Sequence, residues 1–273
     1  MVSVLPNLIS QELLELTRIY SAVGLLSEKH FSLKRPFRAP HHSSSLPALI
    51  GGGSGLRPGE ITLSHRGVLF LDEFPEFHRD VLEALRQPIE SGEITIQRAN
   101  GSIVFPAKFF LIASSNPCPC GYYNDPEKEC TCTSSQVASY QRKLSGPLMD
   151  RFDIFCWVGP VKYDELISTK KSTMSETKQN IEKTRQIQLH RFKNENILVN
   201  AEMRLPEIKK HCQVGRDSEN ILKKYVDSGK LSARGYHRVL KVARTIADLN
   251  NRENISLYDI TEALSYRQRN PND

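Results

Sequence analysis

The sequence predicts an α/β protein in which a parallel sheet is covered by helices and is followed by an all-α C-terminal domain. Short apolar runs at residues 67–71, 108–113 and 154–158 are typical of strands buried on both faces, and helical patterns are interleaved with them. Around residue 160 the sequence becomes helical, polar and lysine-rich, without further strand patterns. We therefore expect two domains, at residues 1–160 and 161–273.

The composition excludes several classes of protein. Hydrophobic residues make up 39% and charged residues 25% of the 273 residues, which is typical of soluble globular proteins. No apolar run approaches the roughly 18 residues that span a membrane, and the start lacks the charged region of a signal peptide. We expect a cytoplasmic protein with no membrane partner. The net charge of +6 is compatible with nucleic-acid binding without requiring it.

The first predicted element is a helix from Ser10 to Leu26, because apolar residues recur at helical spacing and Ser10 is a suitable cap. A loop-rich stretch follows at residues 34–59. Its glycine-rich run at residues 51–55 is expected to be flexible or closely approached by another backbone. The strand at residues 67–71 comes next, and residues 81–90 predict a second helix with one apolar side.

A β-hairpin is predicted after this helix. Residues 94–97 and 102–105 flank Asn100-Gly101, a dipeptide typical of tight hairpin turns.

The helical domain contains three capped helices, which we expect to start near Asp217, Ser232 and Ser256. Asp259 follows the last cap by three residues, which is an acidic variant of the capping box.

Two carboxylates, Asp72 and Glu73, directly follow the strand at residues 67–71. Ligands of parallel α/β sheets bind at the carboxyl ends of strands. Asp72 could bind magnesium, directly or through water, and Glu73 could polarise a water that attacks a phosphate. Alternatively, the acidic residues only mark the point where a buried strand reaches solvent.

Three other residues have both a functional and a structural interpretation. Asn116 ends a buried strand and could hold a water near the phosphate, or form an Asx turn before Pro117. Arg151 could stabilise phosphate charge across a subunit interface, or form a structural ion pair with Asp150 or Asp153. Arg234 could likewise stabilise phosphate charge or form a structural ion pair.

Four of the six cysteines form a C-x-C, nine-residue, C-x-C pattern. In a chain without a signal peptide, clustered cysteines favour a metal over disulfides, and four thiolates suit tetrahedral zinc. An iron–sulfur cluster is the main alternative, and cysteines without a metal are the other. The candidate ligands are Cys118, Cys120, Cys130 and Cys132.

The other cysteines and a histidine pair receive no catalytic role. Cys156 is expected in the core of the strand at residues 154–158, and Cys212 has no assigned function. His41-His42 is expected to make a loop contact, because neighbouring residues seldom bind one metal together.

Several phrases resemble the Mg-chelatase-like AAA+ ATPases of the ComM/YifB type. They are RPFRAPHH, ALIGGGSGLRPGEITLSHRGVLFLDEF, VLEALRQPIESGEI, NPCPCGYY, LSGPLMDRFD and LSARGYHRVLKVARTIADL, and together they cover nearly the whole chain. The resemblance implies an AAA+ core, with a helix-2 insert at about residues 36–59, and a helical lid. It also implies ATP and magnesium as cofactors and a hexameric ring of identical subunits.

The resemblance also implies roles for individual residues. Asp72 and Glu73 match the Walker B pair, and Asn116 matches the first sensor. Arg151 matches the arginine finger that acts on a neighbouring subunit's ATP, and Arg234 matches the second sensor, which contacts the ATP phosphates. The hairpin resembles one that reaches toward DNA in related helicases, so Arg98 beside its turn is a candidate DNA-phosphate contact or simply an exposed strand residue.

Three functions remain open. The first is a DNA motor of the kind that drives branch migration in recombination and natural transformation. The second is the motor subunit of a magnesium chelatase. The third is an inactive interaction partner that donates Arg151 to an intact subunit.

The phosphate-binding loop of such ATPases, G-x-x-x-x-G-K-[ST], is absent from these 273 residues. The glycine run at residues 51–55 does not replace it, because no Lys-Ser/Thr follows. The resemblance places that loop directly before Met1, so a truncation, a split reading frame or an expressed fragment is expected. Without the loop we expect this chain to bind ATP poorly and its sheet to have an open edge or a gap.

Overall fold

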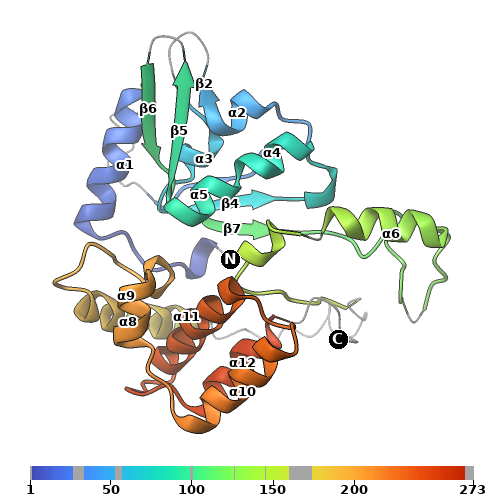
Figure 1. Cartoon of the computed structure of the whole chain (residues 1–273). Coiled ribbons are helices and arrows are strands. Elements are labelled where there is room, and N and C mark those ends of the chain that lie inside the picture. Colours follow the sequence, from blue (N-terminus) through green and yellow to red (C-terminus); the bar gives the residue numbers. More distant parts are fainter. Residues whose placement is uncertain are drawn as a thin grey trace. The chain divides into compact units, whose positions relative to one another are not determined.

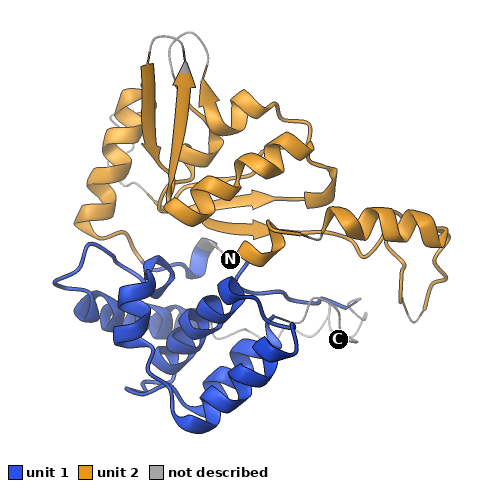
Figure 2. Ribbon diagram, viewed as in Figure 1, with its two compact units in different colours: residues 1, 3–6, 152–273 blue, residues 2, 7–151 orange. Residues whose placement is uncertain are grey.

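The computed structural model describes residues 2–26, 34–52, 57–98, 101–125, 127–144, 146–159 and 174–267. The chain forms two compact units (Figure 2). The N-terminal unit contains residues 2 and 7–151, and the C-terminal unit contains residues 1, 3–6 and 152–273. The boundary predicted near residue 160 lies outside the described residues and stays a prediction.

The N-terminal unit is built on a three-stranded parallel sheet with the order β1-β4-β7 (Figure 1). The strands are β1 (Phe37–Arg38), β4 (Val68–Leu71) and β7 (Phe110–Ala113). Leu69 and Leu71 of the central strand β4 are fully buried, as the apolar run predicts. β1 was not expected, because it lies in the stretch predicted to be loop. The α/β fold class is confirmed.

Two of the predicted buried strands are corrected by the structure. β7 is only partly buried, with Phe110 53% exposed, because β4 is its one partner among the described strands. Residues 154–158 form no strand, and Val158 is 86% exposed. The described part of the C-terminal unit offers no strand to pair with them, and the Phe155 N–H instead donates to the Tyr266 carbonyl at 2.8 Å. Cys156 is accordingly exposed rather than in the core.

Short helices precede β4 in the chain. α1 (Ser10–Ala22) ends earlier than predicted, and its cap position is Ile9, whose N–H donates to Glu12 at 3.2 Å. The stretch predicted to be loop contains the helix α2 and a small antiparallel ribbon of β2 and β3, and the helix α3 follows it. Their bounds are α2 (Leu46–Ile50), β2 (Gly51–Gly52), β3 (Arg57–Pro58) and α3 (Glu60–Leu63). Residues 53–55 of the glycine run lie outside the described residues.

The helix predicted at residues 81–90 is divided in two. α4 (Arg79–Ala84) and α5 (Arg86–Ser91) meet at Leu85. Pro88 explains the break, because it has no N–H to donate and its ring would clash with the carbonyl of Ala84, four residues earlier. A 3-10 turn, η3 (Phe74–Glu76), precedes α4.

The predicted hairpin is confirmed as β5 (Glu93–Arg98) and β6 (Gly101–Pro106). Arg98 pairs with Gly101, so Gly101 belongs to the strand and not to the turn. Asn100, the other predicted turn residue, lies outside the described residues.

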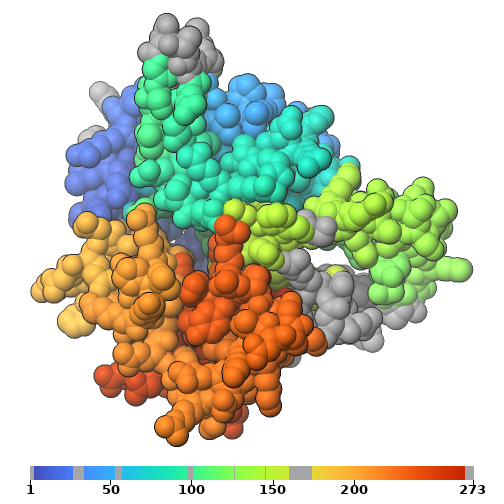
Figure 3. Space-filling view, viewed as in Figure 1, coloured from blue at the N-terminus to red at the C-terminus, as the bar shows by residue number. Residues whose placement is uncertain are grey.

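A cysteine-containing loop follows β7 and leads to α6 (Ser134–Lys143), and together they stand out from the rest of the N-terminal unit (Figure 3). Thr133 caps α6 in a capping box with Gln136, although no helix was predicted here. A 3-10 turn, η4 (Met149–Arg151), ends the unit.

The C-terminal unit is helical, as predicted. Its α-helices are α8 (Met174–Arg191), α9 (Leu205–His211), α10 (Arg216–Asp227), α11 (Ala233–Leu249) and α12 (Leu257–Ser265), with the 3-10 turn η5 (Asn200–Glu202). The 3-10 turn η1 (Val2–Val4) contributes Ser3 and Val4 to the same unit. The predicted caps Ser232 and Ser256 are confirmed, and Asp259 completes the second capping box. α10 begins at Arg216, one residue before the predicted start at Asp217.

Apolar side chains of α11 and α12 form the centre of this unit, with Val239, Ala243 and Ile260 fully buried. Asp248 is also fully buried, and both Arg191 and Arg244 pair with it. Because an unpaired buried carboxylate would be very costly, these two arginines make its burial possible. Among the described residues, no helix is long and apolar enough to cross a membrane.

Candidate functional site

The acidic pair follows the central strand directly, and both carboxylates are exposed. Ser114, at the end of the neighbouring strand β7, donates its hydroxyl to Asp72 Oδ1. The Ser114 N–H donates to the Leu71 carbonyl at 3.0 Å, and the Phe74 N–H donates to the Ser114 carbonyl at 2.9 Å. The ends of two parallel strands are thus joined around Asp72, where such a sheet binds ligands.

Glu73 has a left-handed backbone with φ 52°, which is uncommon for a residue with a side chain. It begins the turn η3, whose Phe74 is 2% exposed and is followed by Phe77, 4% exposed. These buried rings anchor the turn, while the Glu73 side chain remains 56% exposed. The strand end therefore holds one carboxylate against Ser114 and presents the other to solvent.

His42, which lies well before the pair in the chain, contacts Glu73. Its Nδ1 lies 2.9 Å from Glu73 Oε2. The His42 ring also lies 4.1 Å from the His41 ring, centroid to centroid, and meets Phe77 edge-on at 6.4 Å. The sequence predicted a loop contact for this histidine pair but gave no partner, because no local pattern links residues so far apart in the chain.

Asn116 is exposed beyond the end of β7, but the hydroxyl that reaches Asp72 belongs to Ser114. Tyr140 of α6 is buried near Asn116. Burial raises the pKa of Tyr140, the Glu76 carboxylate raises it further, and a hydrogen bond from the Asn116 backbone opposes the change. The role of Asn116 as a sensor stays a prediction.

Arg151 is 7% exposed and lies in η4. It donates to the Pro147 carbonyl at 2.6 Å and pairs with Glu90 at 3.0 Å. Its Nε is buried without a hydrogen-bond partner among the described residues. The sequence named Asp150 or Asp153 as structural partners, but Asp153 pairs with Arg238.

The remaining candidates are placed on separate elements. Arg234 is exposed in the first turn of α11, in the C-terminal unit, and its approach to ATP stays a prediction. Arg98 is the last residue of β5.

The four clustered cysteines are brought together in the loop between β7 and α6. The Sγ atom of Cys118 lies 3.4 Å from that of Cys120 and 3.7 Å from that of Cys130, and all four sulfurs lie within 4.8 Å of one another. Cys118 is fully buried, and the Gly121 N–H donates to its carbonyl at 3.0 Å, which closes the turn. This arrangement confirms that the pattern builds a cluster able to hold a metal.

Without a bound cation, the cysteines of the cluster have different pKa values. The Tyr122 N–H is the main cause of the lowered pKa of Cys120, about 5. The Cys132 N–H acts in the same direction on Cys130, but burial and the neighbouring sulfurs outweigh it and raise that pKa to about 12. A second thiolate beside the first is disfavoured by like charge, and a bound divalent cation would remove this penalty.

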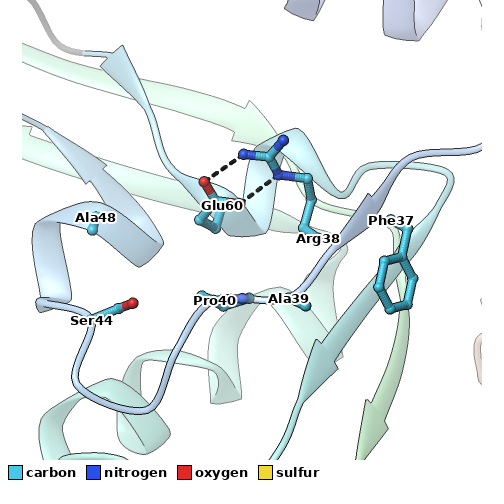
Figure 4. A pocket seen from close by; sticks show the side chains of 7 residues that line it. All are labelled: Phe37, Arg38, Ala39, Pro40, Ser44, Ala48 and Glu60. Atoms are coloured by element: carbon cyan, nitrogen blue, oxygen red, sulfur yellow. Dashed lines mark hydrogen bonds and ion pairs between the residues drawn. The ribbon is translucent and has the colours of Figure 1, made fainter.

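A cavity of about 350 Å³ opens beside β1 in the N-terminal unit (Figure 4). Arg38 and Glu60 meet at its wall through two hydrogen bonds of 2.5 and 2.6 Å. Because these charges satisfy each other, the cavity offers little to a charged ligand. Its lining residues are Phe37, Arg38, Ala39, Pro40, Ser44, Ala48 and Glu60.

Comparison with known proteins resolves the family. The model of magnesium chelatase, subunit ChlI, matches residues 1–166, and that of the ChlI C-terminal region matches residues 171–267. The chain belongs to the magnesium chelatase ChlI family. It is therefore an AAA+ protein of the Mg-chelatase-like type, as the sequence phrases indicated.

Relatives within this family differ in how much of the chain they match. Competence protein ComM of Haemophilus influenzae is 43% identical over 96% of this chain, and the uncharacterized protein YifB of Escherichia coli is 42% identical over 96%. The ChlI subunit of Bigelowiella natans is 37% identical over 26% of this chain and 19% of its own length. The chain spans about half the length of the ComM and YifB relatives, 51% of each.

Proposed function

We propose that this chain supplies the hydrolytic part of an AAA+ ATP-driven motor. The observation that carries the proposal is the carboxylate pair Asp72 and Glu73 at the joined ends of β4 and β7, in a chain of this family. Asp72 would hold magnesium, directly or through water, with Ser114 fixing its orientation. Glu73 would orient and polarise the water that attacks the terminal phosphate.

The donor set fits magnesium, because carboxylate and hydroxyl oxygens are the ligands that this ion prefers. The bound ion would neutralise charge on the phosphates. Asn116 would help to hold the attacking water. Arg234 would contact the phosphates from the helical lid.

Arg151 would act on the ATP of a neighbouring subunit in a hexameric ring. It is held by Glu90 within its own unit, so this role requires the guanidinium to exchange Glu90 for a phosphate. Because Arg151 is buried, its side chain must also become accessible before it can reach a neighbouring subunit.

Zinc is the metal that we propose for the cysteine cluster. Four thiolates would fill all four positions of a tetrahedral ion, so the site would be structural and not catalytic. An iron–sulfur cluster remains the main alternative.

DNA is the proposed substrate, and the cytoplasm is the proposed location. ComM matches nearly the whole chain at 43% identity, whereas two ChlI subunits match 26% and 47% of it at 37% and 28% identity. This pattern favours a DNA motor of the ComM type, with Arg98 contacting a phosphate, over a chelatase motor.

An inactive partner that donates Arg151 to an intact subunit is the third possibility. Adding the chain to an ATPase-active relative tests it. The relative's ATPase would rise with the wild-type chain but not with R151A.

The ATPase prediction concerns these 273 residues themselves. Phosphate release by the purified chain is expected to be negligible, because several phosphate contacts of roughly 1.5–3 kcal/mol each depend on a glycine-rich loop that its sequence does not contain. Release at a rate typical of ATPases would contradict the prediction.

The proposed roles are tested in a fusion of this chain to the N-terminal half of an ATP-hydrolysing relative, which supplies such a loop. There, E73Q should reduce kcat by at least about a hundredfold. E127Q, a change of an exposed glutamate in the cysteine loop, is the matched control and should leave kcat unchanged. If E73Q hydrolysed ATP normally, the assignment of Glu73 would be wrong.

A further inference from the structure

We propose that His42 is a positioning residue that fixes the orientation of the Glu73 carboxylate. The inference rests on the proposed function, in which Glu73 activates water. His42 belongs to a segment between β1 and α2 that was expected to be loop, so the structure adds a member to the site that the acidic pair alone does not suggest.

The contact itself is specific. His42 Nδ1 meets Glu73 Oε2 at 2.9 Å, within the range of a strong hydrogen bond. Glu73 is 56% exposed, and an exposed glutamate without a partner would sample several rotamers. Pairing through one oxygen restricts this motion and leaves the other oxygen able to accept a hydrogen bond from water.

The imidazole is also held in place. It packs against the His41 ring at 4.1 Å and meets the edge of Phe77 at 6.4 Å. The His41 ring is fixed in turn by a hydrogen bond of 2.7 Å between its Nδ1 and the Ser43 hydroxyl. Phe77 closes the turn that Glu73 opens, so one turn carries both the carboxylate and the ring that orients its partner.

The backbone of Glu73 supports the same conclusion. A left-handed φ of 52° is unfavourable for a residue with a side chain, and such conformations persist where surrounding contacts enforce them. The buried rings of Phe74 and Phe77 enforce the turn, and His42 then fixes the side chain that the turn presents.

The first experiment uses the 273-residue chain and needs no ATP. Donation to Glu73 requires the proton of the neutral His42 ring on Nδ1, and nitrogen NMR of labelled histidine reports which ring nitrogen carries it. We expect the Nδ1–H form to predominate in the wild type and to fall severalfold in E73A. In E76A, which removes the exposed carboxylate at the end of the same turn, it should stay as in the wild type.

An unchanged distribution in folded E73A would overturn the proposal. Folding is checked by the buried His65 of the same unit, whose two ring nitrogens have partners outside the turn and whose signals should not move. If E73A does not fold, E73Q at the same position is used, and the His42 signals must then respond to the loss of the anionic acceptor.

The second experiment measures ATP turnover in the same ATP-hydrolysing fusion. Because His42 acts on Glu73 and not on substrate, H42A should lower kcat about tenfold with little change in KM, and H42N should restore part of the rate. Wild-type kcat in H42A, together with inactive E73Q, would overturn the role of His42 alone. Normal turnover in E73Q would instead overturn the proposed function.

Discussion

At the scale of single residues, charged groups in the N-terminal unit are fixed by partners distant in sequence. Glu15 of α1 accepts hydrogen bonds from Arg66 at 2.7 Å and from the buried His65 at 3.0 Å. His65 Nδ1 accepts the Lys108 N–H at 3.1 Å, so its Nε2 carries the proton donated to Glu15. This network ties α1 to the loop that enters β4, at the end of the strand opposite the proposed site.

Glu15 gives a prediction about acid stability. Burial alone would raise its pKa, but hydrogen bonds from His65 and Arg66 outweigh this and lower the pKa from 4.5 to about 2. Its stabilising contribution is therefore complete above pH 4.5 and is lost as the pH falls toward about 2. Chemical denaturation across this window should show a steeper loss of stability in the wild type than in E15Q.

The control for Glu15 is D80N, which changes an exposed carboxylate in α4 and should retain the wild-type slope. Because the Glu15 side chain is 29% exposed, E15Q should cost only about 1 kcal/mol above this window. Identical acid profiles of E15Q and the wild type would show that the network does not stabilise the fold.

At the scale of elements, close backbone packing determines where the strands lie. A Cβ added to Gly67 would lie 2.1 Å from the Pro36 carbonyl oxygen, which accepts the Val68 N–H at 2.8 Å. The start of β4 and the segment before β1 therefore approach too closely for any side chain at residue 67.

Gly67→Ala should lower the free energy of unfolding by about 1–3 kcal/mol, because the methyl group would force β1 away from β4. Urea denaturation measures the change. Gly159→Ala is the control, since its Cβ would meet nothing within 4 Å and its effect should stay within about 0.5 kcal/mol. Equal stability of the two variants would contradict the prediction, because it would mean that the backbone near Gly67 shifts to accept the methyl group at no cost.

The cysteine loop gives a second prediction at this scale. Protein never exposed to chelator should contain about one equivalent of zinc, and C118S should lose most of it because Cys118 lies at the buried centre of the cluster. C156S, at an exposed cysteine outside the cluster, should retain the metal. Elemental analysis showing less than half an equivalent of any metal in the wild type would argue against the site.

At the scale of the whole molecule, the net charge of +6 is compatible with the proposed DNA partner, and the hairpin carries Arg98, the proposed phosphate contact. Binding to branched DNA should weaken as salt increases, and R98A should reduce the slope of log affinity against log salt by about 1. R216A, at the first residue of α10, is a charge-matched control outside the hairpin and should keep the wild-type slope. Equal slopes for R98A and the wild type would remove Arg98 from the interface.

The sequence predicted the features that depend on local patterns. The apolar run of β4, the hairpin, the serine caps of α11 and α12 and the cysteine cluster all follow from residue type and spacing, and the structure confirms them. The split at Leu85 was missed although Pro88 signalled it. β1 was missed because two residues among prolines and glycines give too short a pattern to distinguish from loop.

By itself, therefore, the sequence determined the α/β and helical classes, the family resemblance and the acidic pair, together with the chemistry that we expect of it. Only the tertiary structure decided which groups surround that pair. Ser114 at Asp72, His42 at Glu73 and Glu90 at Arg151 are contacts between elements distant in the chain. Such contacts depend on strand order and on the close approach of backbones, which local periodicity does not encode. For the same reason, pairing between strands, and not hydrophobicity, decided that β4 is buried while Trp157 and Val158 are exposed.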